Sequence, residues 1–123
     1  MYLIYEWLYQ IFYSNHNYQK VHSILGIIGY TLKREGIIDY KEYINQIEER
    51  REAQNIKHPQ MTNEKLNYFD IVIEEYGEAV KARNDYVMQD THKNICHYKD
   101  ELIDLAASLV RFVELEYDSI HWT

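Results

Sequence analysis

The chain has 123 residues, of which 46% are hydrophobic and 27% are charged, enough apolar side chain for the core of one domain. Thirteen basic against twenty acidic residues give a net charge of −7, which argues against a nucleic-acid backbone as the main partner. No apolar run approaches the roughly 18 residues that a membrane span needs. A lone cysteine, Cys96, cannot form an internal disulfide. We therefore expect a cytoplasmic protein that binds neither nucleic acid nor membrane.

The sequence predicts an all-α domain, because only four glycines and one proline interrupt it and apolar residues recur at helical spacing. We expect a bundle of about five helices, over residues 2–13, 18–34, 40–55, 63–83 and 93–118. The Ile- and Tyr-rich piece 24–30 would also suit a strand. Residues 1–38 are predicted to be an N-terminal helical extension, in the core or at an oligomer interface, within one compact domain.

Local signals indicate where helices end and where they approach one another. Asp39 followed by Glu42 resembles a capping box that opens the third predicted helix. The polar run 84–91 is predicted to connect the last two helices. Gly26 and Gly29 mark either close packing or a weak point in the second helix.

The last two predicted helices each carry an apolar stripe. In the fourth helix we expect a buried face formed by Leu66, Phe69, Ile73, Tyr76 and Val80. In the fifth helix we expect burial of Leu102, Leu105, Ala106, Leu109, Val110 and Val113.

Two pairs of carboxylates stand out among the acids because their members are three residues apart. Glu75 and Glu78 fall on one side of the fourth predicted helix, and Glu101 and Asp104 repeat the spacing on the fifth. Both pairs flank the apolar stripe of their helix, so packing the stripes together brings four carboxylates towards one another. Such a cluster requires protonation, paired cations or a bound metal. The alternative is two ordinary helices with acids at the edge of the core.

The side-chain types in this cluster indicate which metal it would take. Oxygen-only ligands favour Mg²⁺ or Mn²⁺ over Zn²⁺, which prefers nitrogen and sulfur. His92, Cys96 and His97 have the character of zinc ligands, but they are only three and lie at a helix start. The Glu-x-x-His spacing of di-iron bundles does not occur in the sequence. We therefore expect Mg²⁺ as the cofactor, with Mn²⁺ as a substitute.

The acid spacing resembles a known family. Residues 74–78 read Glu-Glu-x-x-Glu and residues 101–104 read Glu-x-x-Asp, as in the MazG-like nucleotide pyrophosphohydrolases of the all-α nucleoside triphosphate pyrophosphatase superfamily. Three segments resemble helices of that family, at 48–54, 73–83 and 100–114. The likeness covers residues 47–116, just over half of the chain.

The resemblance implies a catalytic helical region over residues 39–123 that hydrolyses a nucleoside triphosphate between its α and β phosphates. The products would be a nucleoside monophosphate and pyrophosphate. The implied ligands of Mg²⁺ are Glu75, Glu78, Glu101 and Asp104. Glu74, next to the catalytic ligand Glu75, would be a supporting acid or the base that activates water.

The anionic substrate also requires basic side chains near the motifs. The candidates for contacting the phosphates are Lys57, Lys81, Arg83 and Arg111, although each would also serve as an ordinary surface cation. The resemblance further implies a homodimer or homotetramer. Two other functions are compatible with the sequence: a non-catalytic helical interaction protein derived from this family, and a pyrophosphohydrolase for a non-standard nucleotide such as phosphoribosyl-ATP.

Overall fold

The computed structural model of the chain describes residues 18–57 and 65–121. They form four helices: α2 (Tyr18–Arg34), α3 (Tyr40–Lys57), α4 (Lys65–Met88) and α5 (His92–His121). The all-α class is confirmed, and the segment 24–30 is helical. The predicted helix 2–13 lies outside the described residues, so the count of five helices stays a prediction.

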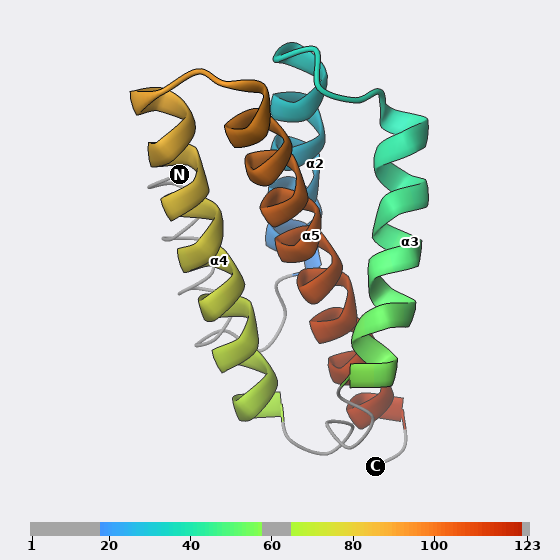
Figure 1. Cartoon of the computed structure of the whole chain (residues 1–123). Helices are drawn as coiled ribbons and strands as arrows, with labels where there is room; N and C mark the ends of the chain where they lie inside the picture. The colour runs from blue at the N-terminus through green and yellow to red at the C-terminus, as the bar shows by residue number, and fades with distance from the viewer. Residues whose placement is uncertain (1–17, 58–64, 122–123) are drawn as a thin grey trace.

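The long helix α5 is the centre of the arrangement. It packs against all three other helices, most extensively against α4, whereas the described backbones of α2 and α4 do not approach each other closely. Figure 1 shows α4 and α3 on either side of α5, with α2 behind it. Consecutive helices run in opposite directions, so α4 and α5 form an antiparallel pair. None of the described helices has the length and apolar content required to cross a membrane.

The turn between α2 and α3 explains why α2 ends at Arg34 and α3 begins at Tyr40, as predicted. Gly36 adopts φ of +70°, and the amides of Gly36 and Ile37 donate to the carbonyls of Lys33 and Leu32, which is a Schellman ending. The amide of Glu42 then donates to Asp39 Oδ1 at 2.9 Å, confirming Asp39 as the N-cap of α3.

The contact between α2 and α3 depends on the absence of a side chain at Gly29. A Cβ atom at this position would lie 2.8 Å from Cε1 of Tyr43, so the Tyr43 ring occupies the space that a larger residue would need. The Tyr43 hydroxyl donates to the carbonyl of Leu25 at 2.8 Å, and burial raises the pKa of this hydroxyl. Gly26 faces open space. The close-packing interpretation is therefore confirmed for Gly29 and not for Gly26.

The core is supplied mainly by α5 and follows the predicted stripe closely. On α5 the predicted Leu102, Leu105, Ala106 and Leu109 are completely buried, as is Ile103, whereas Val110 is half-buried. On α4 the described buried line consists of Val72, Ala79 and Ala82. The side chains of Leu66, Phe69 and Val113, also predicted to be buried, lie outside the described part. Small residues let α4 approach α5 closely, so the predicted, larger Ile73, Tyr76 and Val80 are only half-buried at its flanks.

Helix α4 continues five residues beyond its predicted end at Arg83, because tertiary contacts support its last turn. The ring of Tyr86 stacks on that of Tyr98 in α5, with centroids 5.8 Å apart. The side chain of Asn94 then donates to the carbonyls of Asp85 and Gln89, which closes the turn between α4 and α5. The predicted connection 84–91 therefore shrinks to its last three residues.

Candidate metal centre

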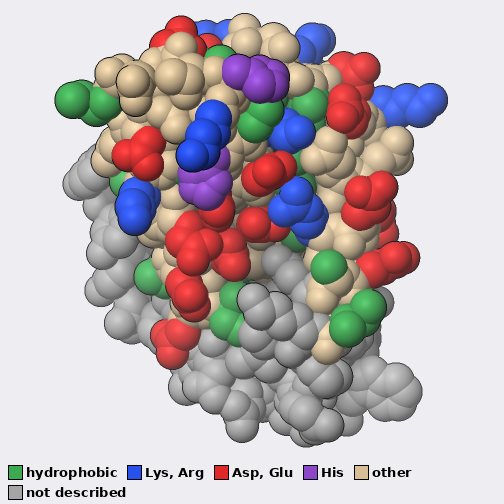
Figure 2. All heavy atoms as spheres, viewed as in Figure 1, with side chains coloured by type: hydrophobic (Ala, Val, Ile, Leu, Met, Phe, Trp, Pro, Cys, Tyr) green, Lys and Arg blue, Asp and Glu red, His purple; other side chains and the backbone are tan. Residues whose placement is uncertain are grey.

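Three of the four predicted ligands come together where α4 and α5 pack. One carboxylate oxygen from each of Glu75, Glu78 and Glu101 lies within 4.8 Å of the other two. Glu75 and Glu78 project from adjacent turns of α4, and Glu101 meets them from the antiparallel α5. Figure 2 shows acidic side chains gathered on this face of the molecule. The spacing of three residues within a helix thus produces a cluster only because α4 and α5 are in this register.

The carboxylates of this group repel one another in a partly desolvated place. Burial raises the pKa of Glu75 to about 7, with further contributions from the charges of Asp104, Glu78 and Glu101. Burial also raises the pKa of Glu101 to about 7, together with its hydrogen bond and charge interaction with Glu78. Near pH 7 the cluster therefore holds protons that ordinary carboxyl groups have already released.

The cluster also contains oxygen atoms whose hydrogen-bonding capacity is unused. Oε2 of Glu75 and Oε2 of Glu101 are buried and have no hydrogen-bond partner in the described structure. Unsatisfied buried acceptors carry a desolvation cost of roughly 1–3 kcal/mol each, and more when charged. A cation with an oxygen preference would satisfy both atoms and relieve the mutual repulsion. The residues present therefore fit Mg²⁺ or Mn²⁺.

The fourth predicted ligand, Asp104, lies close to this group but is paired with a cation from α3. Arg50 donates from Nη1 to Asp104 Oδ1 at 2.6 Å and from Nη2 to Asp100 Oδ1 at 3.2 Å. Burial raises the pKa of Asp104, while the hydrogen bond and charge of Arg50 act to lower it. Arg50 thus already neutralises one edge of the acidic cluster. A metal-binding role of Asp104 stays a prediction.

Sequence reasoning overlooked the groups that border the cluster on α3 and α5. It assigned no role to Arg50, whose pairing with Asp104 spans 54 positions of sequence. His97 is one of the candidate zinc ligands, yet its Nδ1 lies 3.9 Å from Oε1 of Glu101, one helical turn away. The other two candidates contact each other, with Sγ of Cys96 3.5 Å from Nε2 of His92. The spacing of four between His97 and Glu101 was the available signal.

The remaining predicted site residues are not members of the cluster. Glu74 is exposed on α4, directly before Glu75. Lys81 is exposed one turn after Glu78. The other three are dispersed: Arg83 lines a cavity described below, Arg111 is half-buried on α5, and Lys57 is the last residue of α3, with a side chain outside the described part.

Comparisons of the chain with models of protein families, with curated proteins and with solved structures find no match.

Proposed function

We propose that the protein is a Mg²⁺-dependent nucleoside triphosphate pyrophosphohydrolase of the MazG-like type. The observation that carries this proposal is the convergence of Glu75, Glu78 and Glu101 within 4.8 Å, with two buried oxygen atoms unsatisfied. These residues belong to the two motif segments that resemble the family. The proposed reaction is hydrolysis between the α and β phosphates, which yields a nucleoside monophosphate and pyrophosphate.

The proposed ligands of the metal are Glu75, Glu78 and Glu101, joined by Asp104 once it exchanges its ion pair with Arg50 for the metal. The chemistry that a bound Mg²⁺ would supply is charge neutralisation, which would offset the repulsion between an anionic substrate and an acidic protein. Glu75 and Glu101 must release their protons to bind the metal, and their raised pKa values move this release from near pH 4.5 to near pH 7.

The exposed carboxylate of Glu74 is the proposed base, because it lies next to the cluster and is accessible to water. It would orient the attacking water and accept its proton, while Glu75 serves the metal. Lys81, Arg83, Arg111 and Lys57 remain the proposed cations for the phosphate charge. Of these, Lys81 is exposed on the same helix as Glu75 and Glu78.

We further propose that the chain acts in the cytoplasm as a homodimer or homotetramer. Several large apolar side chains of the described residues are exposed: Tyr30, Tyr40, Ile44, Ile56, Val87 and Met88. Covering such side chains is a common reason for association. Sedimentation at micromolar concentration should give a mass of two or four chains, and a monomer of 15.0 kDa would contradict this proposal.

The activity is tested by measuring pyrophosphate release from a panel of ribo- and deoxyribonucleoside triphosphates, with Mg²⁺ and with a chelator. We expect release with Mg²⁺ only, and loss of release in Glu75→Gln. Asp70→Asn provides a matched control, because Asp70 is an exposed acid of the same helix and lies outside the cluster. Pyrophosphate release that is equal in Glu75→Gln and Asp70→Asn would overturn the proposal.

A further inference from the structure

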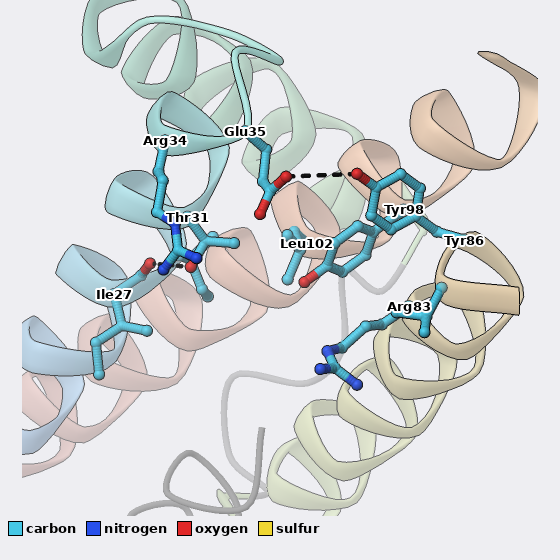
Figure 3. A pocket seen from close by; sticks show the side chains of 10 residues that line it. Ile27, Thr31, Arg34, Glu35, Arg83, Tyr86, Tyr98 and Leu102 are labelled. Atoms are coloured by element: carbon cyan, nitrogen blue, oxygen red, sulfur yellow. Dashed lines mark hydrogen bonds between the residues drawn. The ribbon is translucent and has the colours of Figure 1, made fainter. Parts of the chain in front are cut away.

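A cavity of about 370 Å³ lies between α2 and α4, with α5 as its floor. It exists because α2 and α4 each pack on α5 while their described backbones stay apart. Figure 3 shows side chains entering it from all three helices. Its size falls in the range of small-molecule sites, roughly 300–1,000 Å³.

The cavity and the acidic cluster lie on different sides of the α4–α5 pair. The acidic side of α5 faces α3, since Asp100 and Asp104 bind Arg50 there. The cavity side faces α2, and α5 contributes Tyr98 and Leu102 to it. None of the residues that line the cavity belongs to the acidic cluster, and on α4 they begin with Arg83, more than one helical turn beyond Glu78. A ligand in the cavity would therefore not need the metal centre.

Two guanidinium groups give the cavity a positive charge in a protein of net charge −7. Arg34 enters from the end of α2 and Arg83 from α4, on opposite sides of the Tyr98 hydroxyl (Figure 3). Neither arginine forms an ion pair with another residue of the described structure. The one carboxylate of the lining, Glu35, instead accepts a hydrogen bond from the Tyr86 hydroxyl at 3.4 Å.

The donors in the cavity are suited to an oxyanion with several oxygen atoms. Each guanidinium can form two parallel hydrogen bonds to such a group, and desolvation raises the pKa of the Tyr98 hydroxyl, which keeps it protonated as a donor. A phosphate monoester offers more acceptor atoms and more charge than a carboxylate. It could therefore engage both arginines at once.

The rest of the lining is suited to a flat apolar body. Ile27, Ile28, Val87 and Leu102 contribute aliphatic surface, and the stacked rings of Tyr86 and Tyr98 form an aromatic wall. Apolar surroundings with a few convergent polar groups are the usual composition of a site for a small organic ligand. Neither inorganic phosphate nor a purely apolar molecule would use both parts of this lining.

We propose that the cavity between α2, α4 and α5 binds a phosphate monoester with an aromatic body, the chemical class that includes nucleoside monophosphates. Arg34 and Arg83 hold the phosphate, and the aliphatic and tyrosine side chains hold the ring. This site contains none of the proposed metal ligands, and it assigns Arg83, one of the four cations considered above for the hydrolase, to the monoester instead.

The test is titration calorimetry on the full chain carrying Glu75→Gln, in a chelator, so that neither metal binding nor turnover contributes. The probes are phenyl phosphate, adenosine monophosphate, inorganic phosphate and phenol. Phenyl phosphate should bind at least tenfold more tightly than inorganic phosphate or phenol, because only it uses both parts of the cavity. Tighter binding of adenosine monophosphate than of phenyl phosphate would identify nucleotides as the ligand, and the reverse order would identify simpler aromatic esters.

Variants connect the binding to this cavity. Arg34→Gln and Arg83→Gln should each weaken phenyl phosphate binding about tenfold, the effect expected for one charge-assisted hydrogen-bonding group. Arg83→Lys should recover part of the affinity because it retains the charge. Lys41→Gln, which removes an exposed cation of α3, should leave binding unchanged. The proposal is overturned if phenyl phosphate does not bind at millimolar concentration, or if either arginine variant binds as tightly as Lys41→Gln.

Discussion

The two sides of the α4–α5 pair use charge in opposite ways. On the side towards α3, Glu75, Glu78 and Glu101 are crowded together, and Arg50 of α3 is already bound to Asp100 and Asp104. On the side towards α2, Arg34 and Arg83 line a cavity without ion-pair partners among the described residues, and Glu35 is the one carboxylate of its lining. Acids are in excess on the first side, and guanidinium groups are in excess on the second. Each side of the same helix pair therefore carries a different ligand requirement.

Packing and ligand binding involve different residues of the α4–α5 pair. Both sides are built on one well-packed layer, in which Ala79 and Ala82 of α4 meet the buried face of α5. If stability alone were selected, both edges of this layer would carry buried apolar residues next to ordinary, well-hydrated polar side chains. Here one edge holds carboxyl groups with raised pKa values, and their crowding costs stability. The other edge holds two exposed guanidinium groups, Arg34 and Arg83, without ion-pair partners among the described residues. Clustered groups with raised pKa values are typical of ligand sites.

The largest effect is expected on the acidic side, from Glu75→Gln or Glu78→Gln. Pyrophosphate release should fall by about 100-fold or more, since each change removes an anionic ligand of the metal that stabilises transition-state charge. Thermal stability without metal should hold or rise, because one of several crowded carboxylates is gone. If Glu75→Gln melts much earlier with and without Mg²⁺ yet still cleaves nucleotide, the acids are structural and the comparison fails.

The second prediction concerns pH. Glu75 and Glu101 have pKa values of about 7 in the folded protein, against 4.5 as the ordinary value. Between pH 4.5 and about pH 7 the folded chain binds more protons than the unfolded chain, so the free energy of unfolding falls as pH rises. In a chelator, the melting temperature should therefore be several degrees lower at pH 8 than at pH 5.

Mg²⁺ supplies the control for this pH dependence. It binds the deprotonated carboxylates, so it should stabilise the protein at pH 8 and have little effect at pH 5. The double variant Glu75→Gln/Glu101→Gln should show a shallower fall with pH in chelator. A fall that is equally steep in the double variant would place its origin elsewhere in the chain.

Much of this arrangement follows from local sequence pattern. The buried line of α5, including Leu102, Leu105 and Leu109, follows from helical periodicity because one face meets three other helices. The end of α4 was predicted too early because polar residues on both sides of its last turn, Asn84 and Asp85 before it and Gln89 and Asp90 after it, indicated a connection. The stacking of Tyr86 on Tyr98 that supports this turn is a tertiary contact. Propensity carries no information about such contacts.

The candidate site likewise has features that the sequence of one helix predicts and features that depend on tertiary structure. The pairing of Glu75 with Glu78 could be predicted because both lie on one helix. The ion pair of Arg50 with Asp104 could not, since it depends on how α3 is positioned along α5. The position of Arg83 in a cavity likewise depends on the separation of α2 from α4, which has no signature in the sequence of either helix.

The third prediction tests how the cavity side is held in place. Gly29→Ala should lower the free energy of unfolding by about 1–3 kcal/mol, because the new Cβ would lie 2.8 Å from the Tyr43 ring. Gly26→Ala, in the same helix, faces open space and should instead raise it by about 0.5–1 kcal/mol. Urea denaturation measures both. Since Gly29 lies on α2, facing α3, and the acidic cluster lies on α4 and α5, Gly29→Ala should leave Mg²⁺ binding intact.

The smallest effect distinguishes the arginines of the two sides. Arg50→Gln should cost about 1 kcal/mol of unfolding free energy, as expected for a partly exposed ion pair, while Arg83→Gln should change it by less than about 0.5 kcal/mol.

The loss in Arg50→Gln should also depend on pH. Arg50 lowers the pKa of Asp104, so its removal leaves this carboxyl protonated over a wider pH range in the folded state only. The folded state then binds more protons than the unfolded state, and the cost of Arg50→Gln should be larger at pH 8 than at pH 5. Urea denaturation of both variants at the two pH values measures this. Equal losses in Arg50→Gln and Arg83→Gln at pH 8 would show that the two sides do not differ in how their cations are used.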